Sequence, residues 1–440
     1  MGFFSKIFNN DGNGKPIPEV IKFGRFAETM ETDEQQELAE TADELYENGQ
    51  YKEAYVTFFE YMKLFGGPAV KYQLDEYNDE LNFSIIQGTK TVTGSITDED
   101  VKARALIARC SNVSVALMRY LLSECSSLVY SKFGIDDNFI IICQKCPIRD
   151  MSPAAFKDML SEISQAANSI AEFIAREFPK DVEPHNTNLV ELPAHEVSLK
   201  VKYMREWINE TFSLVESTTN ESIRSIIILR LVFKVMYLIS PEGALLNKFN
   251  SILDIYNEFN PDDDNSTEIN YRMLSELEDV LRMNDRHIRE SIYMTYAVFP
   301  VLCYRTFMEM TEAIAGQLNT LVKLMDMRRD DLVVVACEYI MGAQLCRFGV
   351  HPLAYELFNV MWRAFNTEYF YGLGYREIWY NDSTEQLAGD KIKRELGAIT
   401  AQFARIYGET LNPEAVDYEC LESFGYTFLH QLCTINQITD

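Results

Sequence analysis

The sequence predicts a mainly α-helical protein with one embedded α+β domain, and three patterns along the chain support this class. Apolar residues recur every three or four positions in residues 31–67, as in amphipathic helices. From residue 82 the pattern changes to threonine, valine and isoleucine with alternation, which is typical of strands. Beyond residue 195 the helical period returns and continues. We therefore expect helices, then a sheet with its own helices, then a large helical region.

The first helical segment, residues 31–67, is broken at its centre by Gly49. Glycine can adopt the left-handed backbone that a tight turn between two helices requires. Ala42 and Ala54 are small enough to let the two helices approach closely. The sequence therefore predicts a helical hairpin, and an ordinary antiparallel helix pair is the simplest form of it.

The spacing of six residues in this hairpin resembles the tetratricopeptide repeat (TPR), a helix–turn–helix unit of about 34 residues. These residues are Ala42, Leu45, Gly49, Tyr51, Ala54 and Phe58. Residues 336–361 repeat the same offsets with Gly342, Leu345, Gly349, Ala354 and Phe358. The two segments indicate a helical-repeat character, and the later helices suggest a solenoid-like or irregular bundle.

Residues 68–178 are predicted to form an α+β module in the order helix, three strands, helix, two strands, helix. The first helix is expected at 68–79 and the three strands within 82–110. Polar caps at Ser111 or Asn112, and Ser152 followed by Pro153, indicate the starts of the other two helices. The last two strands are expected to meet at a turn over residues 136–138.

This order, together with the string from Ala103 to Ile163, resembles the type III secretion chaperone-like fold and in particular its YbjN-like branch. Members of that family are non-enzymatic, are usually acidic and dimeric, and hold unfolded protein segments along their sheet and helix faces. The resemblance therefore implies a protein-binding role and a homodimer formed through residues 68–178. It covers about a quarter of the chain.

The predicted domain organisation follows from these patterns and from a proline-containing stretch without periodicity. It comprises a flexible segment at 1–24, a TPR-like helical hairpin at 25–67, the chaperone-like α-βββ-α-ββ-α domain at 68–178, a linker at 179–194 and an all-helical domain at 195–440. Within the last domain we expect helices near 195–216, 220–239, 241–259, 267–283, 286–315, 318–327, 330–347, 352–366, 386–408 and 413–435.

The charge of the chain argues against several classes of partner. It has 40 basic and 67 acidic residues, a formal net charge of −27, so nucleic acid and anionic lipid would be repelled. The most apolar stretch, 221–240, contains Arg224, Arg230 and Lys234, which a membrane span would not tolerate. Nine scattered cysteines and a start without a signal-peptide core predict a cytoplasmic protein with reduced thiols. A basic protein or peptide is the expected partner.

Short motifs give no support for a metal, a cofactor or a catalytic residue. Cys143 and Cys146 form a CxxC pair, but residues three apart on a strand point to opposite faces, and no second pair completes a zinc site. The acidic loop 261–268 lacks the glycine and glutamate of a calcium loop, and residues 11–15 lack the serine or threonine of a phosphate loop. No metal or cofactor is therefore predicted.

The segment 365–382 has an unusual density of aromatic residues around Gly372 and Gly374. Aromatic side chains are enriched in binding hot spots, so this segment is the candidate partner-binding surface. The residues proposed for it are Tyr371, Tyr375, Trp379 and Tyr380. The alternative is that these rings fill the core of the helical domain.

Together these observations predict a non-enzymatic, cytoplasmic, bacterial protein-binding module, a chaperone or scaffold that holds another polypeptide. Two alternatives remain open. The first is an enzyme or metal protein whose site is assembled by the helical domain, and the second is a regulatory or immunity-type protein that binds one basic target.

Overall fold

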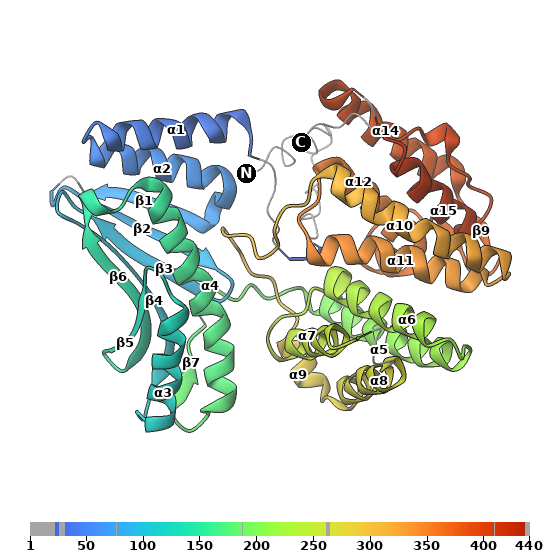
Figure 1. Cartoon of the computed structure of the whole chain (residues 1–440), viewed down its shortest axis with the longest axis horizontal. Helices are drawn as coiled ribbons and strands as arrows, with labels where there is room; N and C mark the ends of the chain where they lie inside the picture. Colours follow the sequence, from blue (N-terminus) through green and yellow to red (C-terminus); the bar gives the residue numbers. More distant parts are fainter. Residues whose placement is uncertain are drawn as a thin grey trace. The chain divides into compact units, whose positions relative to one another are not determined.

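The computed structural model describes residues 23–25, 31–75, 77–186, 188–260, 265–408 and 410–435 (Figure 1). It is mainly helical with an antiparallel sheet, which confirms the predicted class at that level. Its internal contacts divide the chain into two compact units. The sheet unit contains the described parts of 31–191 and 294–301, and the helical unit contains those of 192–293 and 302–440 with residues 23–25. The predicted segment 1–24 lies almost wholly outside the described residues, as do residues 261–264 of the acidic loop.

The sheet unit begins with the predicted helical hairpin, α1 (Asp33–Glu47) and α2 (Tyr51–Gly66). Thr32 and Gln35 cap α1 reciprocally, because each side chain accepts from the other residue's backbone N–H. Gly49 has a φ of 77°, the left-handed conformation expected for the turn. Ala42 and Ala54 are buried where the helices approach. The helix pair and its turn are thus as predicted from the sequence.

The hairpin and the sheet share one hydrophobic core, so the chain is divided differently from the predicted boundary at 67. Phe58 and Phe59 of α2 lie against Phe156 of helix α4 (Pro153–Glu177), with ring centroids 5.3 and 6.1 Å apart. Edge-to-face ring contacts of this kind add to the hydrophobic burial that joins the elements.

All neighbouring strands of the sheet are antiparallel, in the order β1-β2-β3-β4-β6-β5, with β7 pairing with β4. The strands are β1 (Val70–Asp75), β2 (Glu80–Gln87), β3 (Lys90–Ile96), β4 (Asp100–Cys110), β5 (Lys132–Asp136), β6 (Phe139–Pro147) and β7 (Val182–Pro184). Burial alternates along β2 and the first part of β4, so one face packs on the core with α4 and the other faces solvent. Helix α3 (Val115–Glu124) links β4 to β5.

Strand β1 corrects one prediction, because a helix was expected at 68–79. Val70 pairs with Ile85 of β2, and Tyr72 stacks on Phe59 with ring centroids 5.4 Å apart. Asp75 then closes the β1–β2 turn by accepting hydrogen bonds from backbone N–H groups in the turn. The alternation of apolar and polar residues in β1 fits an edge strand, and pairing with β2 overrides the helical tendency.

The predicted linker at 179–194 also differs, since it contains β7 and belongs to the sheet unit up to residue 191. The buried ammonium of Lys90 donates to the backbone carbonyls of Ile107 and His185, each at 2.6 Å. These bonds tie the segment after β7 to the sheet.

A second correction concerns residues 286–315, which were expected to form one helix. The chain instead forms α9 (Asp285–Glu290), an irregular stretch, and α10 (Phe307–Asp326). Two residues of that stretch, Val298 and Phe299, are hydrogen-bonded to the side chain of Gln87 in β2. Gln87 donates to the carbonyl of Phe299 at 2.8 Å and accepts from the N–H groups of both residues. Residues 294–301 thereby satisfy their backbone groups against the sheet unit, which competes with helix formation.

The helical unit contains mostly helices and one short hairpin. They are α5 (Ala194–Glu216), α6 (Glu221–Lys234), the π-helix η5 (Val235–Ile239), α7 (Gly243–Asn257), α8 (Ser266–Arg282), α9, α10, α11 (Asp330–Arg347), α12 (Pro352–Phe365), α13 (Thr367–Gly372), β8 (Tyr380–Asn381), β9 (Gln386–Leu387), α14 (Gly389–Tyr407) and α15 (Leu421–Leu432). Helices α6 and α11 pack together, and most of their residues are buried. The helix pair predicted at 336–361 is present as α11 and α12, although Gly342 adjoins Phe233 of α6.

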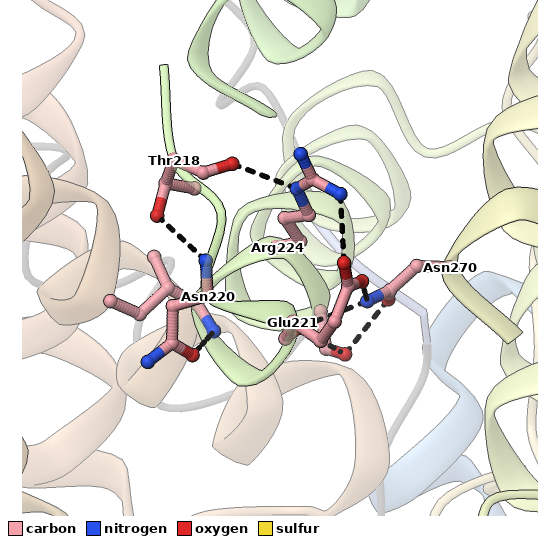
Figure 2. Close-up of polar contacts among 7 residues, drawn as sticks. Thr218, Asn220, Glu221, Arg224 and Asn270 are labelled. Atoms are coloured by element: carbon pink, nitrogen blue, oxygen red, sulfur yellow. Dashed lines mark hydrogen bonds and ion pairs between the residues drawn. The ribbon is translucent and has the colours of Figure 1, made fainter. Parts of the chain in front are cut away.

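A polar network fixes the start of α6, and Figure 2 shows its members. Asn220 caps the helix by accepting from the N–H of Ile223 at 3.2 Å. Arg224 donates to the carbonyl of Thr218 at 2.9 Å and to Glu221 at 2.8 Å. Asn270 of α8 donates to both the carbonyl and the carboxylate of Glu221, at 2.9 and 2.8 Å. These bonds hold α6 in register, and two of its later residues form the site described next.

Candidate functional site

A cavity of about 370 Å³ lies within the helical unit. Its size is in the range of small-molecule sites. It is lined by Tyr203, Trp207, Glu210 and Leu214 of α5, Arg230 and Lys234 of α6, Asp331, Val334, Val335 and Glu338 of α11, Phe365 at the end of α12, Asn366, Thr367, Glu368 and Tyr369 of α13, Tyr380 of β8, and Asp382. The α5 residues are spaced by four, three and four, so they share one helix face.

Three buried ionic groups meet in the lining of this cavity. Arg230 Nε donates to Glu338 Oε2 at 2.6 Å, and Lys234 Nζ lies 3.1 Å from Glu338 Oε1. Asn366 Nδ2 donates to Glu338 Oε1 at 2.8 Å. The side chains of Arg230 and Lys234 are 4% exposed and that of Glu338 is 1% exposed. Two cations thus share one buried carboxylate, and we call this set the buried triad.

The triad changes the proton affinities of its members. Burial alone would raise the pKa of Glu338, but Arg230 and Lys234 lie against it and hold the pKa below its ordinary value. Burial, and next the charge of Arg230, lower the pKa of Lys234 to about 8. Lys234 also lies 4.6 Å from the ring centroid of Trp207, a cation–π contact that favours the charged form.

Arg230 retains hydrogen-bond capacity after these contacts. Its Nη2 donates to Glu210 Oε1 at 3.0 Å, and its Nη1 is buried without a hydrogen-bond partner among the residues that the structure describes. A guanidinium carries five N–H donors, and those on Nη1 of Arg230 are therefore unused. A buried donor without a partner costs about 1–3 kcal/mol, which an acceptor group would recover.

The walls of the cavity are aromatic. Tyr203, Trp207 and Tyr369 contact one another, with ring centroids 5.2 to 5.7 Å apart. Tyr369 also donates its hydroxyl to the carbonyl of Leu238 at 2.8 Å, in the π-helix that follows Lys234. Single π-helical turns often occur at functional sites. The three rings form an aromatic part of the cavity lining.

The solvent-exposed part of the lining, its mouth, carries Asp331, Glu368 and Asp382, and the partly exposed carboxylate of Glu210 bonds to Arg230. Asp331 pairs with Arg329 at 2.8 Å. Among the described residues, Glu368 and Asp382 have no ion-pair partner. The two lining cations, Arg230 and Lys234, are therefore matched by Glu338 and Glu210, and the exposed part of the lining carries further negative charge.

The structure divides the four aromatic residues proposed as a partner surface. Trp379 is 1% exposed and stacks on the guanidinium of Arg363 at 3.8 Å, so it belongs to the core. Tyr375 is half-buried against the same guanidinium. Tyr371 is 56% exposed, and Tyr380 lines the cavity. The four do not form one surface, because Tyr375 and Trp379 pack against Arg363.

The other motifs give no site. Cys143 lies beside Arg104 and Lys132 in the pairing of β4, β6 and β5, whereas Cys146 pairs with the core residue Val101. The two thiols therefore lie on opposite faces of the sheet, as the spacing predicted. Within the described ranges, no three histidine, cysteine, aspartate or glutamate side chains are placed to hold a metal ion.

The buried triad was not predicted from the sequence, although one signal was present. Arg230 and Lys234 are cations in the most apolar stretch of the chain, where they served only to argue against a membrane span. In the described part of the chain, no helix is both long and apolar enough to span a membrane. Cations retained in an otherwise buried helix indicate a buried counterion, here Glu338, 104 residues further along.

No protein-family model matches the chain, and a search of curated proteins finds no match. The resemblances to the TPR and to the type III secretion chaperone-like fold stay predictions from sequence pattern.

Proposed function

We propose that this protein is a non-enzymatic, cytoplasmic binding protein that holds another polypeptide, and that the cavity of the helical unit is its binding site. The observation that carries the proposal is the exposed part of the cavity lining, where Glu368 and Asp382 occur together with the aromatic residues Tyr203, Trp207 and Tyr369. Carboxylates attract basic side chains, and aromatic rings supply contact area at little cost in conformational entropy. The net charge of −27 favours encounter with a basic partner.

A direct test is fluorescence anisotropy of the full chain with three labelled peptides of equal length that are basic, neutral or acidic. The basic peptide is expected to bind best, and its affinity should fall as the salt concentration rises from 50 to about 300 mM, because salt screens exposed charges. The double variant Glu368→Gln, Asp382→Asn is expected to weaken this binding. Equal binding of all three peptides, or no binding of any, would contradict the proposal.

One observation favours the alternative, an enzyme with a site in the helical unit. Lys234 is a buried amine whose pKa is lowered to about 8, beside a cavity. Groups with perturbed proton affinity are concentrated in catalytic sites, although structural ion pairs produce the same effect. A neutral amine condenses with an aldehyde to an imine with loss of water, so glyoxylate with cyanoborohydride would label a reactive Lys234. Peptide mapping that finds the adduct at Lys234 before surface lysines would favour the enzyme.

A further inference from the structure

We infer that residues 23–25 act as a latch within the helical unit. Docked on the π-helix η5 and on helix α13, they hold Tyr369 in the place where it lines the cavity. The latch therefore sets how tightly the cavity binds its ligand, and this last step rests on the proposed function.

One aromatic ring joins the latch to both helices. Phe23 is 9% exposed, and its ring centroid lies 6.0 Å from that of Tyr237 in η5 and 5.3 Å from that of Phe370 in α13. A ring buried against two elements resists their separation, because parting them exposes apolar surface to water. Phe370 directly follows Tyr369, so Phe23 supports the same helical turn that carries the cavity wall.

Gly24 adds backbone hydrogen bonds to the end of η5. Its N–H donates to the carbonyl of Tyr237 at 2.8 Å and to the hydroxyl of Ser240 at 3.0 Å. Gly24 has a φ of 71°, and a Cβ atom at this position would lie 2.9 Å from the Tyr237 ring. Glycine is therefore needed both for the backbone conformation and for the close approach.

The latch and the cavity wall bind neighbouring carbonyls of η5. The last carbonyls of a helix have no partner within it and must find one elsewhere. The carbonyl of Tyr237 accepts from Gly24, and that of Leu238 accepts from the Tyr369 hydroxyl at 2.8 Å. Ser240, which ends η5, has a φ of 52°, a conformation that a residue other than glycine keeps only where its surroundings stabilise it. A change at Gly24 is thereby transmitted to Tyr369.

The latch can open without unfolding the helical unit. The ring contacts and hydrogen bonds described for residues 23–25 come from one ring and one N–H group. Helices α6 and α11, in contrast, bury most of their residues. Segments with few buried contacts open locally while a well-packed core stays closed. Loss of the latch is therefore expected to loosen η5 and α13 alone.

The test is hydrogen exchange measured by mass spectrometry on the full chain and on Phe23→Ala. Amides at 237–240 and in α13 are expected to exchange at least tenfold faster in the variant, while those of α6 and α11 keep their rates. Gly24→Ala should give the same pattern, because its methyl group meets the Tyr237 ring. Arg25→Ala, at a half-buried neighbour, is the matched control and should keep the native rates.

Rescue by a peptide separates a latch from an ordinary core residue. A peptide of residues 20–27, added in excess to Phe23→Ala, should restore slow exchange at 237–240. The same peptide with alanine in place of Phe23 carries the same charge and should have no effect. Native exchange rates in Phe23→Ala would overturn the inference, as would an equal acceleration in α6 and α11.

The effect on the cavity is measured by fluorescence anisotropy with the basic peptide of the proposed function. Phe23→Ala should weaken its binding at least fivefold, and Arg25→Ala should leave it unchanged. Faster exchange in α13 with unchanged affinity would overturn the link between the latch and the cavity. If the native chain binds no basic peptide, the proposed function fails and the binding step with it, while the exchange rates still decide whether residues 23–25 hold η5 and α13.

Discussion

The two units each hold a carboxylate by several hydrogen bonds, but with different donors. In the sheet unit, Glu162 of α4 accepts from the backbone N–H groups of Val129, Tyr130 and Ser131 and from the Ser131 hydroxyl, at 2.6 to 3.1 Å for the closest contact of each. In the helical unit, Glu338 accepts from two cationic side chains and an amide beside a cavity.

The difference indicates which carboxylate belongs to a functional site. Glu162 accepts from the backbone N–H groups of residues 129–131 and so fixes this loop. Its role is therefore structural. Side-chain cations on Glu338 are buried, leave donors unused, and cost free energy to desolvate. Glu338 lines the cavity and Glu162 does not, so the triad is assigned to the candidate site.

The largest expected effect is that of Glu338→Ala. The substitution leaves Arg230 and Lys234 buried without their shared counterion, and breaking a buried ion pair in this way costs about 3–5 kcal/mol. Tryptophan fluorescence during urea unfolding measures this, because all three tryptophans, Trp207, Trp362 and Trp379, lie in the helical unit. Glu210→Gln is the matched control; its carboxylate is 46% exposed, so a loss of under about 1 kcal/mol is expected. Equal losses of unfolding free energy in the two variants would contradict the claim that the buried carboxylate contributes more to stability than the exposed one.

A smaller effect is expected for Glu162→Ala in the sheet unit. It removes the acceptor of three N–H groups at residues 129–131, at a cost of about 1–3 kcal/mol. Hydrogen exchange should become faster at residues 129–131, while the tryptophan-detected unfolding of the helical unit stays unchanged. Glu162→Gln, which keeps one oxygen acceptor, should give an intermediate result. Unchanged exchange at these amides would show that the carboxylate does not hold the loop.

The hydrogen bonds from residues 129–131 to Glu162 also predict that the stability of this loop depends on pH. Burial alone would raise the pKa of Glu162, but the hydrogen bonds from Ser131 and from the backbone of residues 129–131 together lower it. A carboxylate whose pKa is lowered in the folded state contributes stability above its ordinary pKa of 4.5, and that contribution is lost as the pH falls through the folded value. Exchange at 129–131 should therefore approach that of Glu162→Ala only below pH 4.5, after correction for intrinsic exchange rates.

In the helical unit, Lys234 predicts a rise in stability with pH in the alkaline range. Its pKa is about 8 in the folded state and 10.5 in its ordinary state, so the unfolded chain binds more protons between these values. Stability therefore rises with pH from about 8 to about 10.5. Urea unfolding followed by tryptophan fluorescence should show this rise in the native chain and a smaller one in Lys234→Met. Identical pH profiles would mean that Lys234 does not titrate as its surroundings imply.

The smallest expected effect on stability belongs to the mouth of the cavity. Glu368→Gln with Asp382→Asn changes two exposed side chains without ion-pair partners among the described residues. The free energy of unfolding should therefore change by no more than about 0.5 kcal/mol. The same variant is expected to alter peptide binding. A large loss of stability would show that these carboxylates are structural.

Much of the fold could be predicted from local sequence pattern, and the predictions that were wrong share one cause. The hairpin of α1 and α2 followed from apolar spacing and Gly49, both of which are local signals. Strand β1 and the stretch 294–301 were assigned to helices because their partners, β2 and Gln87, determine their conformation. Gln87 lies more than two hundred residues before Phe299, and no periodicity records such a contact.

The site was less predictable than the fold, for the same reason. Arg230 and Lys234 stood out as charges in an apolar helix, but their counterion Glu338 lies in another helix and is surrounded by apolar residues. Aromatic density at 365–382 drew attention to Trp379, which the structure buries over Arg363, while Tyr380 lines the cavity. Composition identifies residue types, and only the packing of α5, α6, α11 and α13 brings the triad and the rings together.

The most direct test of the proposed function is the urea midpoint of the helical unit, followed by tryptophan fluorescence, with and without a saturating basic peptide. A ligand that binds only the folded unit stabilises it by about 2.7 kcal/mol at a hundred times its Kd. The account predicts this upward shift for the native chain, and little or none with an acidic peptide of equal length or in the Glu368→Gln, Asp382→Asn variant. A midpoint that moves equally for the basic and the acidic peptide, or does not move at all, would contradict it.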